Sequence, residues 1–225
     1  MSKTSLVALI LGAGPKVGLP AAKAFASRGY KVAIAARSLN EADSTNNQLN
    51  IKSDFANPDD VVRAFSKVKK ELGIPSVVIY NAGAATFAPP GDPFAMSLDA
   101  FQRDMTVNNT SVFVAAQQAV LGFAELPADA PRVFFFTGNI LNVTALPQFL
   151  ESGAGKSASA HMMMAAAAEF YYVDQRKPDG SAAFKIDGEA HSQLFLELAE
   201  AKTQGPWLQT FVKGTGYQDF GPYRL

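Results

Sequence analysis

Residues 153–157 read Gly-Ala-Gly-Lys-Ser, and this lysine and serine resemble the end of a phosphate-binding P-loop. A P-loop needs another glycine five residues before the glycine of the Gly-Lys pair, directly after a strand. That position holds Leu150, and the preceding apolar run ends near residue 136. The spacing therefore excludes a P-loop, and the chemistry of Lys156 depends on the other motifs of the chain.

A second set of glycines follows the first apolar run of the chain, in the stretch LGAGPKVG. Gly12, Gly14 and Gly18 lie where a predicted strand turns into a predicted helix. Glycine permits the tight turn, and its missing side chain lets a pyrophosphate approach the backbone N–H groups of the helix N-terminus. This position is typical of a dinucleotide-binding loop, and we expect Lys16 and Val17 to contact the cofactor within it.

The charges at the strand ends indicate which dinucleotide binds. The second predicted strand ends at Arg37, where an Asp or Glu would bind a free ribose 2′-hydroxyl. An arginine suits a 2′-phosphate, and Lys16 can approach the same region, so the cofactor is predicted to be NADP(H). Asp54 ends the third apolar run and can accept a hydrogen bond from an adenine amino group.

Short apolar runs alternate with helical patterns along the chain, with no linker or internal repeat between them. Strands that are apolar on both faces indicate a parallel sheet covered on both sides. The expected fold is α/β: one doubly wound Rossmann domain over residues 1–225, with three α/β/α layers and ligands at the carboxyl ends of the strands. The predicted strands are 6–11, 31–36, 49–54, 77–80, 132–136, 170–173 and 208–212, and the predicted helices are 18–28, 59–72, 98–123, 157–169 and 189–203.

Composition excludes several other functions. Twenty basic residues balance twenty acidic ones without a basic run, so a nucleic-acid partner is not expected. The absence of cysteine excludes disulfides and thiolate chemistry, and His161 and His191 are too far apart in sequence to suggest a metal site. No apolar stretch approaches the ~20 residues that span a bilayer. We therefore expect a cytoplasmic enzyme or binding protein that acts on a small molecule, without a membrane or a metal.

Taken in order, the motifs resemble those of the short-chain dehydrogenase/reductase superfamily over about residues 5–170. The glycine loop and Arg37 are followed by Asp54-Phe55 after the third strand and by Asn81-Ala82-Gly83 after the fourth. The resemblance implies that Phe55, Ala82 and Gly83 also line the cofactor site. The stretch VNNTSVFVAAQQAV resembles the helix that carries the family's structural and catalytic Asn, which falls at Asn108.

The resemblance is incomplete in two places: Lys16 stands where the family usually has a glycine two residues before Gly18, and the catalytic end departs as well. The family has a Ser after the fifth strand and a Tyr four residues before a Lys that holds the nicotinamide ribose. Lys156 fits the Lys position, the Tyr position holds Ser152, and the Ser position holds Gly138 or, shifted by one, Asn139. An aliphatic hydroxyl is a far weaker acid than a phenol, so Ser152 is a poor direct replacement for the tyrosine.

Three functions remain open on this reading. The chain is an NADP(H) oxidoreductase with another proton donor, an NADP(H)-binding sensor or partner-binding module without turnover, or a non-redox enzyme on the same fold. For the first, Tyr171, Tyr172, His161 and a water bound to Ser152 are candidate donors.

The last part of the chain is less informative. A helix is predicted to begin at Asp187 or Gly188, with Leu194, Leu198 and Ala201 on an apolar stripe. The helix after Lys156 is apolar almost all round, and family members pack this helix against a symmetry mate. The resemblance thus implies a homodimer or homotetramer.

Overall fold

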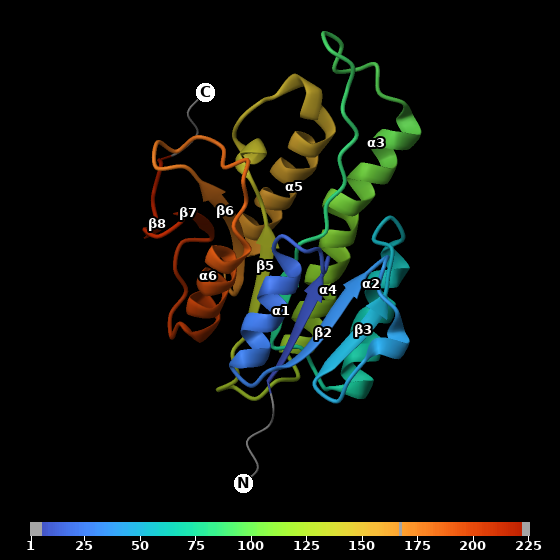
Figure 1. The fold of residues 1–225 in the computed structure, drawn as a ribbon, viewed down its shortest axis with the longest axis vertical. Coiled ribbons are helices and arrows are strands. Elements are labelled where there is room, and N and C mark those ends of the chain that lie inside the picture. Colours follow the sequence, from blue (N-terminus) through green and yellow to red (C-terminus); the bar gives the residue numbers. More distant parts are fainter. Residues whose placement is uncertain (1–5, 167, 222–225) are drawn as a thin grey trace.

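The computed structural model describes residues 6–166 and 168–221; residues 1–5, 167 and 222–225 lie outside the described part. Its strands form one sheet in the order β3-β2-β1-β4-β5-β6-β7-β8 (Figure 1). All neighbours pair in parallel except β8, which is antiparallel to β7. The strands are β1 Val7–Leu11, β2 Lys31–Ala36, β3 Gln48–Lys52, β4 Val77–Tyr80, β5 Val133–Thr137, β6 Phe170–Arg176, β7 Leu208–Val212 and β8 Gly216–Tyr217.

Helices cover both faces of this sheet, which confirms the predicted three-layer Rossmann fold (Figure 1). Helices α1 (Gly18–Ser27) and α6 (Gly188–Glu200) pack on one face, and α2 (Pro58–Glu71), α4 (Ser111–Phe123) and α5 (Leu150–Ala166) pack on the other. Alternate residues of β1 join different cores, because successive strand side chains point to opposite faces. The sheet is therefore buried on both sides, as its apolar runs predicted.

Helix α5 begins earlier than its sequence suggests. The predicted start at residue 157 is wrong, because the helix runs from Leu150 and contains both Ser152 and Lys156. Gly153 and Gly155 weaken helix propensity, but packing outweighs this cost. A Cβ at Gly155 would lie 2.7 Å from the Cβ of Asn108, so this glycine permits close contact between the helices. The predicted end at 169 is also too late, and residue 167 lies outside the described part.

Several other boundaries differ, and the predicted ends at 54 and 203 are too late, because β3 ends at Lys52 and α6 ends at Glu200. The predicted helix 98–123 is divided into α3 (Leu98–Met105), a π-helical turn (Thr106–Thr110) and α4. Strand β6 continues to Arg176 through three polar residues, whereas its predicted end was 173. The short antiparallel β8 was not predicted. Helix α6 begins as expected, because the Asp187 side chain accepts a hydrogen bond from the Ala190 N–H at 2.9 Å.

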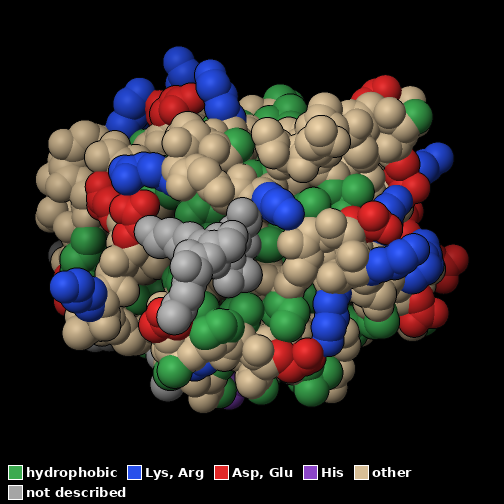
Figure 2. Space-filling model, turned by 90° about the horizontal axis from the view of Figure 1, so that it is seen from below, with side chains coloured by type: hydrophobic (Ala, Val, Ile, Leu, Met, Phe, Trp, Pro, Cys, Tyr) green, Lys and Arg blue, Asp and Glu red, His purple; other side chains and the backbone are tan. Residues whose placement is uncertain are grey.

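The carboxyl ends of the parallel strands face the upper part of Figure 1, where the segment after β4 rises beside the start of α5. The Ala88 N–H donates to the Gln148 carbonyl at 3.1 Å and joins these two segments. On the opposite edge, Figure 2 shows acidic and basic side chains interspersed rather than gathered by sign. Across residues 6–166 and 168–221, no helix is both long and apolar enough to cross a bilayer.

Candidate active site

The glycine loop joins β1 to α1 in a compact turn. Gly12 has a φ of +102°, and a Cβ there would lie 2.3 Å from the Ala82 nitrogen. A Cβ at Gly18 would lie 2.3 Å from the Gly12 carbonyl oxygen, whereas one at Gly14 would meet nothing within 4 Å. Asn81 closes the turn by donating from Nδ2 to the Gly12 carbonyl at 2.8 Å. The loop is thus tight where it contacts protein and open at Gly14, where a ligand can approach.

The start of α6 supports this loop from the other side. A Cβ at Gly188 would lie 1.9 Å from the Lys16 carbonyl oxygen and 2.7 Å from the Pro20 ring. Only glycine allows this contact. The polar segment before α6 therefore ends in direct contact with the glycine loop. The sequence indicated a helix start here but gave no sign of the contact with residue 16.

Two neighbouring clefts extend from the glycine loop. The smaller, of about 440 Å³, is lined by Arg37, Asp54 and Phe55. The larger, of about 820 Å³, is lined by Lys16, Val17 and Lys156. Both include four residues of the loop and of the β4 end, which are Gly14, Pro15, Asn81 and Gly83. The clefts thus form a continuous path across the edge of the sheet, in which Arg37 and Lys16 line different parts.

Lys156 lies at the inner end of the larger cleft. Its Nζ donates to the Thr137 carbonyl at 2.9 Å, at the end of β5, and lies 4.4 Å from the centroid of the Phe136 ring. Burial lowers the pKa of this ammonium group to about 8, with Asp174 and Glu151 opposing the shift. The group therefore exchanges its proton near neutral pH, unlike an exposed lysine.

The first of the two expected serine positions, Gly138, has no room for a side chain. A Cβ at Gly138 would lie 2.0 Å from the Tyr172 ring. The Tyr172 hydroxyl donates to the Asn139 carbonyl at 2.7 Å and accepts from the Asn139 N–H at 3.1 Å. The side chain of Asn139 accepts from the Leu141 N–H at 3.0 Å, at the start of a short 3₁₀ turn. Tyr172 thus fixes the backbone where the family has a serine, and its own hydroxyl is fully engaged.

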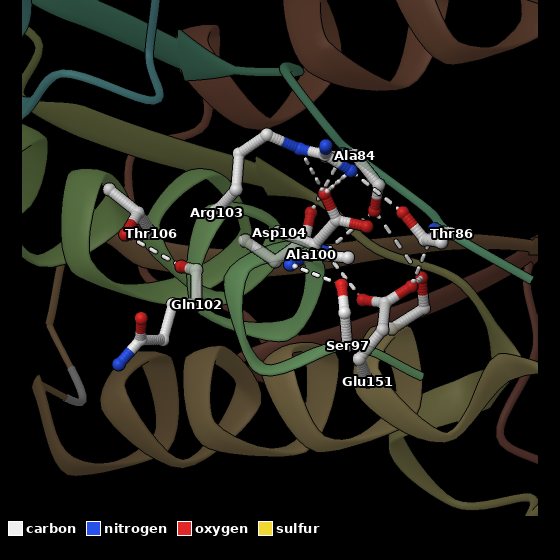
Figure 3. A network of polar contacts seen from close by, with 11 residues as sticks. Ala84, Thr86, Ser97, Ala100, Gln102, Arg103, Asp104, Thr106 and Glu151 are labelled. Atoms are coloured by element: carbon white, nitrogen blue, oxygen red, sulfur yellow. Dashed lines mark hydrogen bonds and ion pairs between the residues drawn. The ribbon is translucent and has the colours of Figure 1, made fainter. Parts of the chain in front are cut away.

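Ser152 does not line the larger cleft. Its hydroxyl donates to the Glu151 carboxylate at 3.0 Å and lies 3.4 Å from the Ala84 carbonyl oxygen. Glu151 is buried and also accepts from the Thr86 N–H at 3.1 Å. Figure 3 shows its side chain pointing from α5 toward Thr86, in the segment after β4. Burial raises the pKa of the Glu151 carboxyl, with a hydrogen bond from Ser152 opposing the shift. This pair holds the segment after β4 onto α5.

Asn108, in the π-helical turn, binds the same segment after β4. Its side-chain amide donates to the Ala84 carbonyl at 2.7 Å, and its side-chain carbonyl accepts from the Ala84 N–H at 3.0 Å. Its backbone carbonyl accepts from the Ser159 hydroxyl at 2.7 Å. Asn108 therefore holds the segment after β4 in place. It does not itself line the larger cleft.

The polar end of β6 and the start of α6 bring three groups to the site that the sequence did not predict to lie there. Asp174 and Arg176 form a buried ion pair, on the same face of the strand because they are two residues apart. Asp174 and His191 both line the larger cleft. Burial raises the pKa of Asp174 to about 6, although Arg176 and Lys156 oppose the shift. In the sequence, the only sign of the Asp174–Arg176 ion pair is that two charged residues directly follow the predicted apolar strand 170–173.

His191 packs against Phe211, with its ring edge-on at 4.9 Å between centroids, and burial lowers its pKa. Its Nδ1 lies 2.8 Å from the Asp187 carbonyl oxygen, so in the neutral ring Nδ1 carries the proton and Nε2 is an acceptor. The other candidate donors lie elsewhere: Tyr171 is buried with its hydroxyl against the Gly205 N–H, and His161 is exposed on α5. Neither lines the larger cleft.

The comparison with known proteins decides the family. The model of the short chain dehydrogenase family matches residues 6–174, about three quarters of the chain. The chain belongs to this family. It is 44% identical to the short chain dehydrogenase/reductase dmxR12 of Cryptosporiopsis sp., over 96% of both chains. It is 29% identical to a 3-beta-hydroxysteroid dehydrogenase of Comamonas testosteroni, over 68% of this chain and 58% of that protein.

Solved structures of short-chain dehydrogenases share its fold. A metagenomic short-chain oxidoreductase in complex with NADP superposes with a TM-score of 0.78 at 16% identity, over 94% of this chain and 99% of that one. A 3-ketoacyl-(acyl-carrier-protein) reductase from Brucella melitensis complexed with NADH gives 0.76 at 19% identity, over the same shares. One of these neighbours holds NADP and the other NADH, and both share the fold of this chain.

Proposed function

We propose that this short-chain dehydrogenase is an NADPH-dependent reductase of carbonyl compounds in which Lys156 supplies the proton. The observation that carries the proposal is that Lys156 lines the larger cleft, while Ser152, at the place of the family's tyrosine, does not. The two clefts share four residues, so a dinucleotide extended across them brings its reactive end toward Lys156.

The residues along this path fit NADP(H). Gly14 leaves open space before the start of α1, as a pyrophosphate requires. Arg37 and Asp54 line the smaller cleft and suit a 2′-phosphate and an adenine amino group. When bound, NADPH supplies a hydride to the carbonyl carbon of the substrate. The protein's own residues then have to orient that carbonyl and protonate its oxygen.

Lys156 can do both. One of its N–H groups is held by the Thr137 carbonyl, which leaves two for a ribose hydroxyl and the substrate oxygen. An ammonium group with a pKa of about 8 is a better acid near neutrality than any aliphatic hydroxyl. After it donates its proton to the carbonyl oxygen, the neutral amine is stabilised by its buried surroundings and regains a proton from solvent.

The experiment that tests the cofactor is thermal unfolding with NADPH and with NADH. We expect NADPH to raise the melting temperature more than NADH, and Arg37→Ala to remove most of this difference. The matched control is Arg28→Ala, because Arg28 is an exposed arginine at the end of α1 that lines none of the clefts beside Arg37. Equal protection by both cofactors in the unmodified protein would exclude the assignment to NADP(H).

A second candidate is a protein that binds NADP(H) without turnover. It is favoured by the Ser152 hydroxyl, which is bonded to Glu151 instead of facing the cleft. Loss of NADPH absorbance with ketones, imines or enones separates the two functions. Tight NADPH binding without oxidation by any of these compounds would favour the second candidate.

We also propose that the chain forms a homo-oligomer through α4. Phe113, Val120 and Leu121 are each more than half exposed on this helix. They lie at i, i+7 and i+8, on one face. Sedimentation velocity at micromolar concentration should show a dimer or tetramer, and a monomer alone would exclude it.

A further inference from the structure

Three phenylalanines from different parts of the chain line the larger cleft. Phe87 follows β4, Phe149 precedes α5, and Phe184 precedes α6. The rings of Phe87 and Phe149 meet edge to face, with centroids 5.0 Å apart and planes at 75°. Such a pair presents a ring face and a ring edge together, which is the arrangement that another aromatic ring can extend.

Two of these rings are largely exposed. Phe87 is 65% exposed and Phe184 is 77% exposed, although both line a cleft. A single exposed apolar side chain needs no explanation, but several at one cleft mark a binding surface. The aliphatic side chains of Leu141, Leu146 and Ile186 extend this surface. A ligand that covers it removes apolar area from water, which stabilises the complex.

Few charged residues line the same cleft, and two of the three are buried. The charged residues that line it are Lys16, Lys156 and Asp174. Lys16 belongs to the glycine loop, and Asp174 is held in a buried ion pair. Lys177 lies with its Nζ 5.9 Å from the centroid of the Phe184 ring, but it does not line the cleft. The aromatic part thus contributes no cation to its own lining, and burying a phosphate or carboxylate there without a partner would be costly.

From these features we propose that the cleft takes a planar, uncharged aromatic ketone of at least two fused rings, with its carbonyl toward Lys156. This inference rests on the proposed reductase function and names its substrate class. The volume of about 820 Å³ is in the upper part of the range for small-molecule sites, and it leaves room for more than one ring beside the nicotinamide end of the cofactor.

The test compares α-tetralone with 1-decalone, a ketone on the same fused skeleton without an aromatic ring. Dissociation constants are measured by titration calorimetry with and without NADP⁺, and a tetralone that carries a carboxylate on its aromatic ring is the charged probe. We expect α-tetralone to bind about tenfold more tightly than both others, since an aromatic pair adds up to about 1.5 kcal/mol beyond area burial. Equal binding of 1-decalone or of the carboxylate, or no binding of α-tetralone, would overturn the inference.

Variants of the phenylalanines test the site itself. Phe87→Ala and Phe184→Ala should each weaken α-tetralone binding about five- to tenfold, and Phe87→Leu should lose most of this affinity while it retains an apolar side chain. Phe94→Ala is the matched control, because Phe94 lies on the same segment as Phe87, is 81% exposed and does not line the cleft. An unchanged affinity in both alanine variants, or an equal loss in the control, would place the ligand elsewhere.

The same measurements separate this inference from the reductase function. If α-tetralone binds selectively but NADPH is not oxidised, the ligand class holds and the proposed reaction fails. If NADPH is oxidised by 1-decalone as efficiently as by α-tetralone, the reaction holds and the ligand class fails.

Discussion

The two ends of the cleft path, at the glycine loop and at Lys156, differ in the kind of residue on which they depend. At the dinucleotide end, Gly12, Gly14 and Gly18 form the expected loop, and Asn81 closes it through the Gly12 carbonyl. At the catalytic end, Ser152 stands where the resemblance places the tyrosine, and Gly138 or Asn139 stands where it places the serine. The form of the dinucleotide end depends on the backbone shape of the glycine loop. The chemistry of the catalytic end depends on buried charged side chains.

This difference has a physical cause. A glycine loop needs glycine only where its backbone contacts other protein atoms closely, as at Gly12 and Gly18. A proton can come from any group with a suitable pKa and position, so the catalytic end can change its residues without changing the fold. Lys156, Asp174 and Arg176 form a buried charged group beside the cleft, where the family's phenol is missing.

The largest expected effect is at Lys156. Lys156→Met should lower kcat/KM for ketone reduction about a thousandfold, because it removes the proposed proton donor. Folding should be retained, because Asp174 keeps its ion pair with Arg176 when the lysine is replaced. Lys23→Met is the control, because Lys23 is exposed on α1 and lines neither cleft of the path, and it should retain kcat/KM. Equal losses in both variants, measured by NADPH absorbance, would assign the effect to charge alone.

Restoring the family's serine should damage the protein. Gly138→Ser places a Cβ against the Tyr172 ring, and we expect the free energy of unfolding to fall by about 3 kcal/mol. Asn139→Ser, at the neighbouring position, should cost less than about 1 kcal/mol, because serine can also accept from the Leu141 N–H. Denaturant titration compares them, and a stable Gly138→Ser variant would show that the catalytic end is less tightly packed than the contact implies.

At the dinucleotide end, Gly188→Ala should weaken NADPH binding about tenfold, because the added methyl group displaces the Lys16 carbonyl and with it the loop. Gly153→Ala is the matched glycine, with its nearest contact at 3.6 Å, and it should bind normally. It should also stabilise α5 by roughly 0.5–1 kcal/mol. An unchanged dissociation constant for Gly188→Ala would mean that the loop does not need support from α6.

The last prediction concerns the pH dependence that follows from the pKa of Lys156, and it needs no variant. Burial lowers the pKa of Lys156 from 10.5 to about 8, so its ammonium form is lost above pH 8. For reduction, kcat/KM should be level below this pH and fall about tenfold per unit above it. For stability the sign is opposite: the native state binds fewer protons than the unfolded state between about 8 and 10.5, so this group's contribution rises with pH there. A reduction rate that stays level to pH 10 would exclude Lys156 as the donor.

Much of the dinucleotide end could be predicted from local sequence. Gly12, Gly14 and Gly18 follow an apolar run that can only be a buried strand, and Arg37 follows the next run. Strand, turn and helix are adjacent in the chain there, so short-range patterns describe the geometry. The start of α5 could not be predicted in this way, because its glycines resemble a loop until Asn108 is known to pack against Gly155.

By itself, the sequence determined the Rossmann layers, the cofactor loop and the departure at Ser152, because these follow from periodicity and from residue types at fixed spacing. The tertiary structure decided which groups meet at the cleft. It brings Gly188 to Lys16, Tyr172 to Gly138 and Asp174 to the cleft that Lys156 lines, across separations that no local pattern spans. It also sets the pKa of Lys156, because burial is a property of the folded chain.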